Sequence, residues 1–192
     1  TPGVSIYQVG TGLPTAGPQT LASAGLPTTT VQYQSFYFAD LNPAVSWGNT
    51  SYDTLYSTNA SSNGLDVKKF SYVVTAGVGA WQASGAVSLT GASNLTGYTS
   101  GSSVVLYVTQ STAGTGGLKT LTDTTGYNAD FSSLTFADLS TPVTAGTNYG
   151  LRGISFVPRA GVGTTTTITS VTPATVEQGS SVTFTATVVA AS

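Results

Sequence analysis

Residues 29–39 have the sequence TTVQYQSFYFA, and this stretch decides the fold class. Its side chains alternate, which places Val31, Tyr33 and Tyr37 on the face opposite Gln32, Gln34 and Phe36. Because successive side chains of an extended chain point to opposite faces, such alternation predicts a half-buried strand. Aromatic and β-branched residues also fit the pleated surface of a sheet.

Further segments of this kind follow at a spacing of about ten residues, which is typical of an antiparallel sandwich or barrel. Each is closed by Gly, Pro, Asn or Asp: VKKFSYVVTA (67–76), WQASGAVSLTG (81–91), SSVVLYVTQ (102–110), SSLTFADL (132–139) and NYGLRGISFVPR (148–159). No window of about a dozen residues repeats apolar positions at the spacing of a helix. We therefore predict an all-β chain that folds as an antiparallel β-sandwich.

The first part of the chain, residues 1–30, contains four Pro and many Gly, and it predicts an extended N-terminal arm. A short strand candidate within it supplies the candidate strand-exchange residues Val4, Ile6, Tyr7 and Val9. Such an arm can dock on its own sandwich or complete a sheet edge of a neighbouring subunit. Both arrangements stay open. The sandwich domain itself is predicted to span residues 31–160.

The last part, residues 161–192, predicts a Thr-rich linker followed by the first strands of another β domain. Alternation places Val182, Phe184, Ala186 and Val188 opposite Thr183, Thr185 and Thr187. Two strands cannot bury their own apolar face, since a complete immunoglobulin-like domain needs about seven strands. Either the chain continues into further material of this kind, or these strands pack on the sandwich or on another copy.

Composition excludes several functions. Charged residues make up 6% of the chain and the formal net charge is −2, so no cluster of cations is present to bind a nucleic acid. The chain has no Cys and no His, which excludes disulfides, thiolate zinc sites and His-activated nucleophiles. No apolar run approaches the roughly 20 residues that span a bilayer, so we expect no membrane insertion.

Carboxylates are the remaining candidates for catalysis: Asp40, Asp53, Asp66, Asp123, Asp130, Asp138 and Glu177. A glycosidase needs two of them facing each other across the substrate, but Asp at strand ends and turns ordinarily caps its own backbone. We expect no catalytic residue, no cofactor and no enzymatic activity. A structural calcium ion at Asp123, Asn128 and Asp130 is the alternative to a self-bonded turn in the segment TDTTGYNADFSS (122–133), whose spacing differs from the acidic twelve-residue calcium loop.

Aromatic residues concentrate in YQSFYFADLNPAVSWGNTSYDTLYS, residues 33–57. Trp47, Tyr52 and Tyr56 stand beside Gly, Asn and Ser, and they are candidate contacts for a subunit interface or a glycan, with core packing as the alternative. Lys68 and Lys69 lie in a predicted strand, one on each face, where edge protection is favoured over anion binding.

Two family resemblances add to this interpretation. SSVVLYVTQ followed by SSLTFADLSTPVTAGTNYGLRGISF resembles the jelly-roll modules of secreted and virion-surface proteins; Pro142 ends one strand and Gly146 turns the chain toward Tyr149. The segment SVTPATVEQGSSVTFTATV is similar to the start of the bacterial immunoglobulin-like (Big-type) repeats of surface proteins, with Pro173 and Gly179 at the expected places.

These resemblances imply a non-catalytic structural protein of an extracellular surface assembly, most specifically a bacteriophage virion component such as a capsid decoration or fibre subunit. Its expected partners are copies of itself, other surface-assembly proteins and host-surface glycans. One alternative is a subunit of a bacterial or archaeal cell-surface filament or adhesin. Another is a carbohydrate-binding module of a secreted protein, which would place the aromatic residues on an exposed face.

Overall fold

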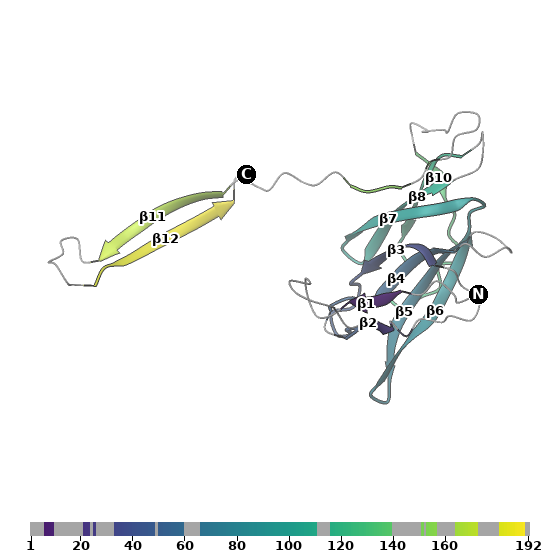
Figure 1. Ribbon diagram of the computed structural model, residues 1–192, viewed down its shortest axis with the longest axis horizontal. Helices are drawn as coiled ribbons and strands as arrows, with labels where there is room; N and C mark the ends of the chain where they lie inside the picture. The colour runs from purple at the N-terminus through teal and green to yellow at the C-terminus, as the bar shows by residue number, and fades with distance from the viewer. Residues whose placement is uncertain are drawn as a thin grey trace. The chain divides into compact units, whose positions relative to one another are not determined.

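The computed structural model describes residues 6–9, 21–23, 25, 33–48, 50–59, 66–110, 116–139, 151, 153–156, 164–172 and 181–190. These residues contain strands and turns but no helix (Figure 1). The chain divides into two compact units, Thr1–Ser155 and Phe156–Ser192, whereas the sequence predicts a boundary after residue 160.

Two four-stranded antiparallel sheets build the first unit. One has the order β3 (Tyr33–Ala39), β4 (Thr54–Asn59), β5 (Asp66–Thr75) and β6 (Val78–Ser88). The other has the order β10 (Ala137–Asp138), β9 (Leu118–Asp123), β8 (Ser103–Gln110) and β7 (Ala92–Ser100). The sheets pack against each other, which confirms the predicted all-β antiparallel sandwich.

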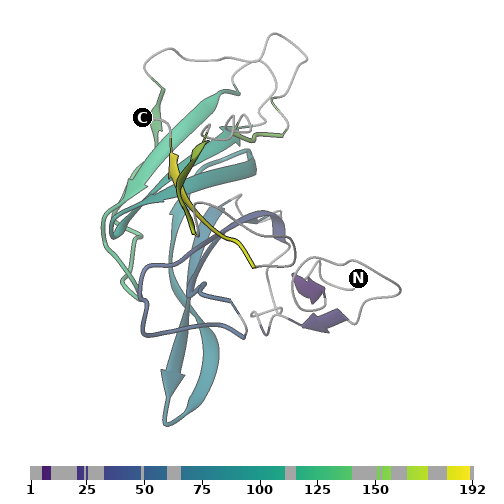
Figure 2. The same cartoon turned by 90° about the vertical axis from the view of Figure 1, so that its left-hand side faces the viewer.

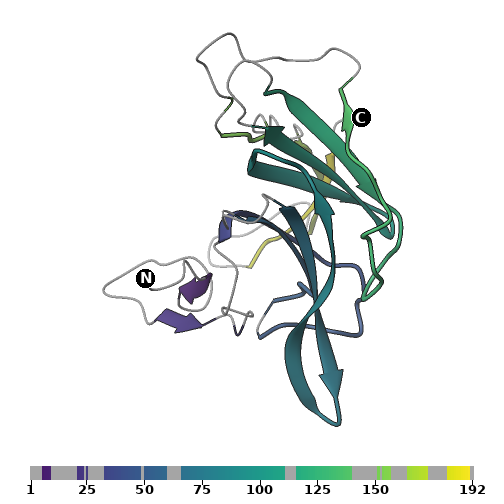
Figure 3. The same cartoon turned by 90° about the vertical axis from the view of Figure 1, so that its right-hand side faces the viewer.

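Strands that follow each other in the chain are neighbours within each sheet. The described strands thus form meanders without Greek-key crossovers, and the jelly-roll form of the sandwich stays a prediction. The β5–β6 connection is a two-residue turn in which Ala76 has φ 51° and Gly77 has φ 79°. This long hairpin projects beyond the other strands of its sheet (Figures 2 and 3).

The two sheets enclose an aliphatic inner core. Val104, Leu106 and Val108 of β8 are fully buried because alternate residues of this strand face the first sheet. They pack with Tyr56, Val67, Val87, Leu95, Leu121 and Phe131. Gly97 in β7 permits a close approach, since a side chain there would stand 3.1 Å from the ring of Tyr37.

Hydrogen bonds join the β3 side of the first sheet to β7 of the second. The Ser35 hydroxyl donates to the Leu95 carbonyl at 3.1 Å, and the Leu95 amide donates to the Ser35 oxygen at 3.0 Å. The Thr58 hydroxyl donates to the Ser93 carbonyl at 2.8 Å. These polar bridges occupy backbone groups at the strand edges, so the sandwich is closed along this side.

The register of β3 shifts between Tyr33 and Ser35. Tyr37 therefore packs on the inner core, whereas Tyr33 packs on the opposite side of the sheet. The predicted placement of these two tyrosines on one face is wrong, because a bulge changes the alternation at this point.

A second bulge lies in β6, where three residue steps from Ala83 to Ala86 oppose two steps in β5. Gly85 takes up the extra residue with φ 101°. Beside it the Ser84 carbonyl accepts the Phe131 amide at 3.2 Å, and the Ala86 amide donates to the Ser132 hydroxyl at 3.1 Å. The bulge thus fastens the loop that covers this end of the inner core.

Two predicted strands differ from the structure. In the segment 132–139 only β10 is a strand, because the Asp130 carboxylate accepts both the amide and the hydroxyl of Ser132 and forms a turn. The segment 148–159 has no strand among its described residues, 151 and 153–156. Pro142, Gly146 and Tyr149 lie outside the described residues.

Two shorter sheets complete the structure. In the arm, β1 (Tyr7–Val9) pairs antiparallel with β2 (Leu21–Ser23). In the second unit, β11 (Thr164–Thr172) pairs antiparallel with β12 (Thr183–Ala190), with a register shift near Ser170. Ile168 in this ribbon is 60% exposed.

Candidate interaction site

The face of the first sheet that points away from the inner core carries an outer aromatic cluster. We use this name for Tyr33, Phe36, Phe38, Trp47, Tyr52, Phe70, Tyr72 and Trp81. Leu55 and Ile6 fill the space between the rings. The cluster is thus built on β3 to β6 and is covered by a loop and by part of the arm.

Phe38 lies at the centre of the exposed side of this cluster. Its ring stacks on Trp47 at 5.5 Å with an interplanar angle of 11°, and on Tyr52 at 5.6 Å and 27°. Phe36 approaches it edge-on at 5.7 Å. Such ring pairs contribute about 0.5–1.5 kcal/mol each beyond burial of their area, and they hold the cluster in one arrangement.

Asp53 positions the loop that carries Trp47. This carboxylate is fully buried, and it accepts the amides of Leu41 at 3.0 Å and Asn42 at 2.6 Å, together with the Thr54 hydroxyl at 2.6 Å. The Trp47 amide in turn donates to the Tyr52 carbonyl at 3.0 Å. The buried carboxylate therefore has a structural role in the aromatic loop.

The three aromatic candidates do not share one surface. Trp47 is half-buried and Tyr52 is 42% exposed, and both belong to the outer aromatic cluster. Tyr56 is 0% exposed because it lies on the central strand β4, one residue after Leu55, and therefore faces the inner core. For Tyr56 core packing replaces the predicted surface contact, and the structure adds Phe36, which is 50% exposed.

The candidate arm residues are also separated. Ile6 is 8% exposed and packs in the chain's own outer aromatic cluster, whereas Tyr7 is 52% exposed. Val9 pairs with Leu21 of the same arm, and Val4 lies outside the described residues. Strand exchange with a second copy stays a prediction.

The sequence interpretation missed a buried charge centre. Lys69 points into the inner core and pairs with Asp123 at 2.8 Å, and both side chains have 0% exposure. The Tyr56 hydroxyl donates to the same carboxylate oxygen, Oδ2, at 2.6 Å. The predicted edge protection is wrong, because β5 lies between β4 and β6. No sequence pattern indicated that β9 brings Asp123 to this lysine.

Burial and hydrogen bonding shift the pKa values of Tyr56 and Asp123 in this buried charge centre. Burial, with the hydrogen bond to Asp123, raises the pKa of Tyr56 well above its ordinary value. Burial alone would raise the pKa of Asp123, but hydrogen bonds from Lys69, Thr125 and Tyr56 outweigh it and leave that pKa below its usual value. The tyrosine is therefore protonated and the aspartate is charged at neutral pH.

Several of the described carboxylates are held by other groups of the chain. Asp123 binds Lys69, Asp130 accepts from Ser132, and Asp138 pairs with Lys119. Groups of three or more metal-binding side chains are absent from the described part of the chain. Asp123 is buried and Asp130 is exposed, so the predicted calcium ligands have different surroundings and partners. Glu177 lies outside the described residues.

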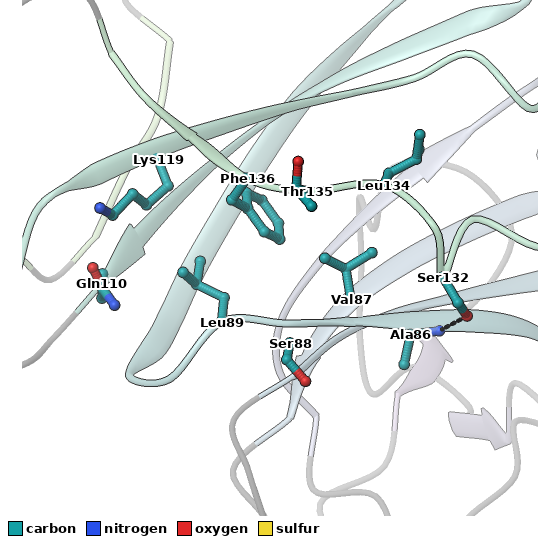
Figure 4. Close-up of a pocket in the computed structure, with 10 residues that line it drawn as sticks. All are labelled: Ala86, Val87, Ser88, Leu89, Gln110, Lys119, Ser132, Leu134, Thr135 and Phe136. Carbon is teal, nitrogen blue, oxygen red and sulfur yellow. Dashed lines mark hydrogen bonds between the residues drawn. The ribbon is translucent and has the colours of Figure 1, made fainter.

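A pocket of about 450 Å³ opens at one end of the sandwich (Figure 4). Its apolar lining comes from Val87, Leu89, Leu134 and Phe136, and its polar lining includes Gln110 and Lys119. Both polar groups already have partners within the chain. The side-chain amide of Gln110 donates to the Thr90 carbonyl at 2.7 Å, and Lys119 pairs with Asp138. The pocket has space for a small molecule.

Comparisons with protein-family models, with curated proteins and with solved structures give no match. In the part of the chain that the structure describes, no helix has the length and apolarity needed to cross a bilayer. Among the described residues, apolar side chains are exposed on the outer aromatic cluster, on the projecting β5–β6 hairpin and on the β11–β12 ribbon.

Proposed function

We propose that this protein is a non-catalytic structural component of an extracellular surface assembly, in its most specific form a bacteriophage capsid decoration or fibre subunit. Its partners in this proposal are copies of itself and other surface-assembly proteins. A cell-surface filament or adhesin subunit would use the same contacts. The weakly charged, His-free and Cys-free composition supports a role in contact over a role in turnover.

The observation that carries the proposal is the β11–β12 ribbon. Its strands are paired from one end to the other apart from a register shift near Ser170, yet the described side chains of residues 167–170 are all exposed. A two-stranded ribbon by itself is marginally stable in water, so a regular ribbon of this length needs a covering surface. In the proposed assembly a neighbouring subunit provides that surface.

Self-association of the full chain tests this proposal by analytical ultracentrifugation over a range of concentrations. We expect oligomers that Ile168→Lys weakens at least tenfold, since a charge would enter an apolar contact. Thr167→Lys is the matched control, because it adds the same charge on the opposite face of the same strand and should have a smaller effect. A monomer at every concentration would contradict the proposal.

Exposed aromatic rings favour a second candidate, a carbohydrate-binding module. Phe36 and Tyr52 present half-exposed rings beside the stacked Phe38, and such rings suit the apolar faces of sugars. Binding to a glycan array that Tyr52→Ala removes and Tyr7→Ala retains would support it. Combined with a stable monomer, that result would replace the assembly proposal.

A further inference from the structure

The buried charge centre connects the two layers of the sandwich. Lys69 belongs to β5 of the first sheet, and Asp123 is the last residue of β9 in the second sheet. Their side chains meet between the sheets at 2.8 Å, without exposure to solvent. Removing an ammonium and a carboxylate from water is unfavourable, so packing alone does not explain why this pair is buried.

The amine is held in one position by hydrogen bonds. Lys69 Nζ donates to Asp123 Oδ2 at 2.8 Å, to the Thr125 hydroxyl at 3.0 Å and to the Gly126 carbonyl at 2.7 Å. The rings of Tyr56 and Phe131 lie next to each other beside the amine, each with its centroid 5.9 Å from Nζ. Desolvated lysines can act as nucleophiles, and the fixed contact holds Nζ beside the carboxyl group of Asp123.

The carboxyl group has different donors on its two oxygens. The amide and the hydroxyl of Thr125 donate to Asp123 Oδ1 at 2.8 and 2.6 Å. The Tyr56 hydroxyl donates to Oδ2 at 2.6 Å. Donors of this kind stabilise negative charge that develops on an oxygen when a nucleophile adds to the carbon. Oδ1 therefore has the surroundings of an oxyanion, and Oδ2 those of a leaving group.

We propose that Lys69 and Asp123 condense to an amide that covalently links the two sheets. A proton first passes from Nζ to Oδ2, which gives a neutral amine and a carboxylic acid. The amine lone pair then adds to Asp123 Cγ, and the negative charge develops on Oδ1 between the Thr125 donors. A second proton passes from nitrogen to Oδ2, the Cγ–Oδ2 bond breaks, and water leaves as the carbonyl re-forms.

This reaction balances without a co-reactant. An ammonium and a carboxylate become one amide and one water molecule, with no change in net charge and no electron transfer. Fixed contact replaces a bimolecular encounter and is equivalent to an effective concentration of about 10⁵ M or more. The Tyr56 hydroxyl assists the departure of Oδ2 by donating its hydrogen bond to that atom.

The test is the intact mass of the purified full chain after denaturation, followed by peptide mapping. We expect a mass lower than the sequence mass by one water molecule, and a branched peptide in which the segment with Lys69 is joined to the segment with Asp123. The ion pair of Lys119 and Asp138 is an internal control, because it is partly exposed to solvent and should stay unlinked.

Variants distinguish the proposed chemistry from simple ion pairing. Lys69→Arg keeps the positive charge, and its measured mass should equal the mass of its own sequence. The neighbouring Lys68→Arg should still have a mass lower than that of its sequence by one water molecule. Tyr56→Phe keeps the ring and should slow the reaction on the order of a hundredfold. Circular dichroism of each variant verifies that the sandwich has folded.

The measured mass of the chain without substitutions tests the proposal even if a variant fails to fold. A folded chain that retains the full sequence mass after prolonged incubation at neutral pH overturns the proposal. Loss of water that maps to an aspartate imide, without the branched peptide, overturns it as well. The oligomeric state does not enter this measurement, so its outcome is independent of the proposed function.

Discussion

The two faces of the β3–β6 sheet are covered in different ways. The inner face packs against aliphatic residues of the second sheet, such as Leu106 of β8. One buried ion pair also lies between the two sheets. The outer face is covered by an aromatic loop and by Ile6 of the arm, and Phe36 and Tyr52 stay half-exposed. The second sheet leaves the residues of the inner core buried, whereas the loop of stacked rings leaves part of its apolar surface in contact with solvent.

This difference also separates stability from recognition. The inner core has almost no exposed area, so its residues contribute through burial and packing density. The outer aromatic cluster combines packing with exposed rings, and substitutions there should lower the free energy of unfolding less than truncations in the inner core do. The following predictions test this division.

The largest expected effect is that of Gly85→Ala. Gly85 has φ 101°, and a Cβ at this position would collide with Asp130 Oδ1 and stand 2.5 Å from the Ser132 hydroxyl. Backbone strain and overpacking together should lower the free energy of unfolding by about 3 kcal/mol. Urea unfolding measures this loss. Gly101→Ala is the control, since it also has positive φ but open space around it, and an equal loss there would contradict the collision.

Truncation on the two faces should differ in size. Leu106→Ala removes a fully buried inner-core side chain and should lower the free energy of unfolding by about 3 kcal/mol. Trp47→Ala removes a ring of the outer aromatic cluster and should lower it by about 1–2 kcal/mol, because that ring is only partly buried. Thermal and urea unfolding compare the two variants. Equal losses would show that the outer face contributes to folding as much as the inner core.

The pKa of Tyr33 depends on how well the outer face of the sheet is buried. Burial raises its pKa from 10.0 to about 12. Because the folded state holds the proton more tightly, this contribution is complete below pH 10 and is lost as the pH rises through about 12. We expect a loss of about 1–2 kcal/mol over that interval, after allowance for solvent screening. Urea unfolding of the native chain and of Tyr33→Phe measures it, and the variant should lose less.

The smallest effect is expected at the tip of the projecting hairpin. Ala76 adopts φ 51°, a left-handed conformation in which Asn is more favourable than Ala. Ala76→Asn should raise the free energy of unfolding by about 0.5 kcal/mol. Thermal unfolding would detect this increase as a shift of a few degrees or less. A decrease in the free energy of unfolding would indicate that this turn is not of the two-residue type that favours Asn followed by Gly.

Periodicity in the sequence was sufficient to predict the sandwich and its strands β3, β5, β6 and β8, because alternating apolar residues specify strands with one buried face. It did not predict β4, β7 and β9. It could not place Tyr33 and Tyr37 on opposite faces, since a bulge depends on pairing with a distant strand. It also could not predict the contact of Lys69 with Asp123, because 54 residues separate them and the packing of two sheets brings them together. For Trp47 and Tyr52 a contact with a subunit or a glycan stays a prediction, whereas Tyr56 is buried because its side chain faces the inner core.

The β5–β6 hairpin has a practical consequence for engineering. Its turn residues, Ala76 and Gly77, are exposed and belong to neither hydrophobic cluster. Exposed turns of this kind accept inserted sequences because no buried contact is lost. A foreign epitope placed between these two residues would be displayed at the end of a rigid strand pair, with its termini held close together.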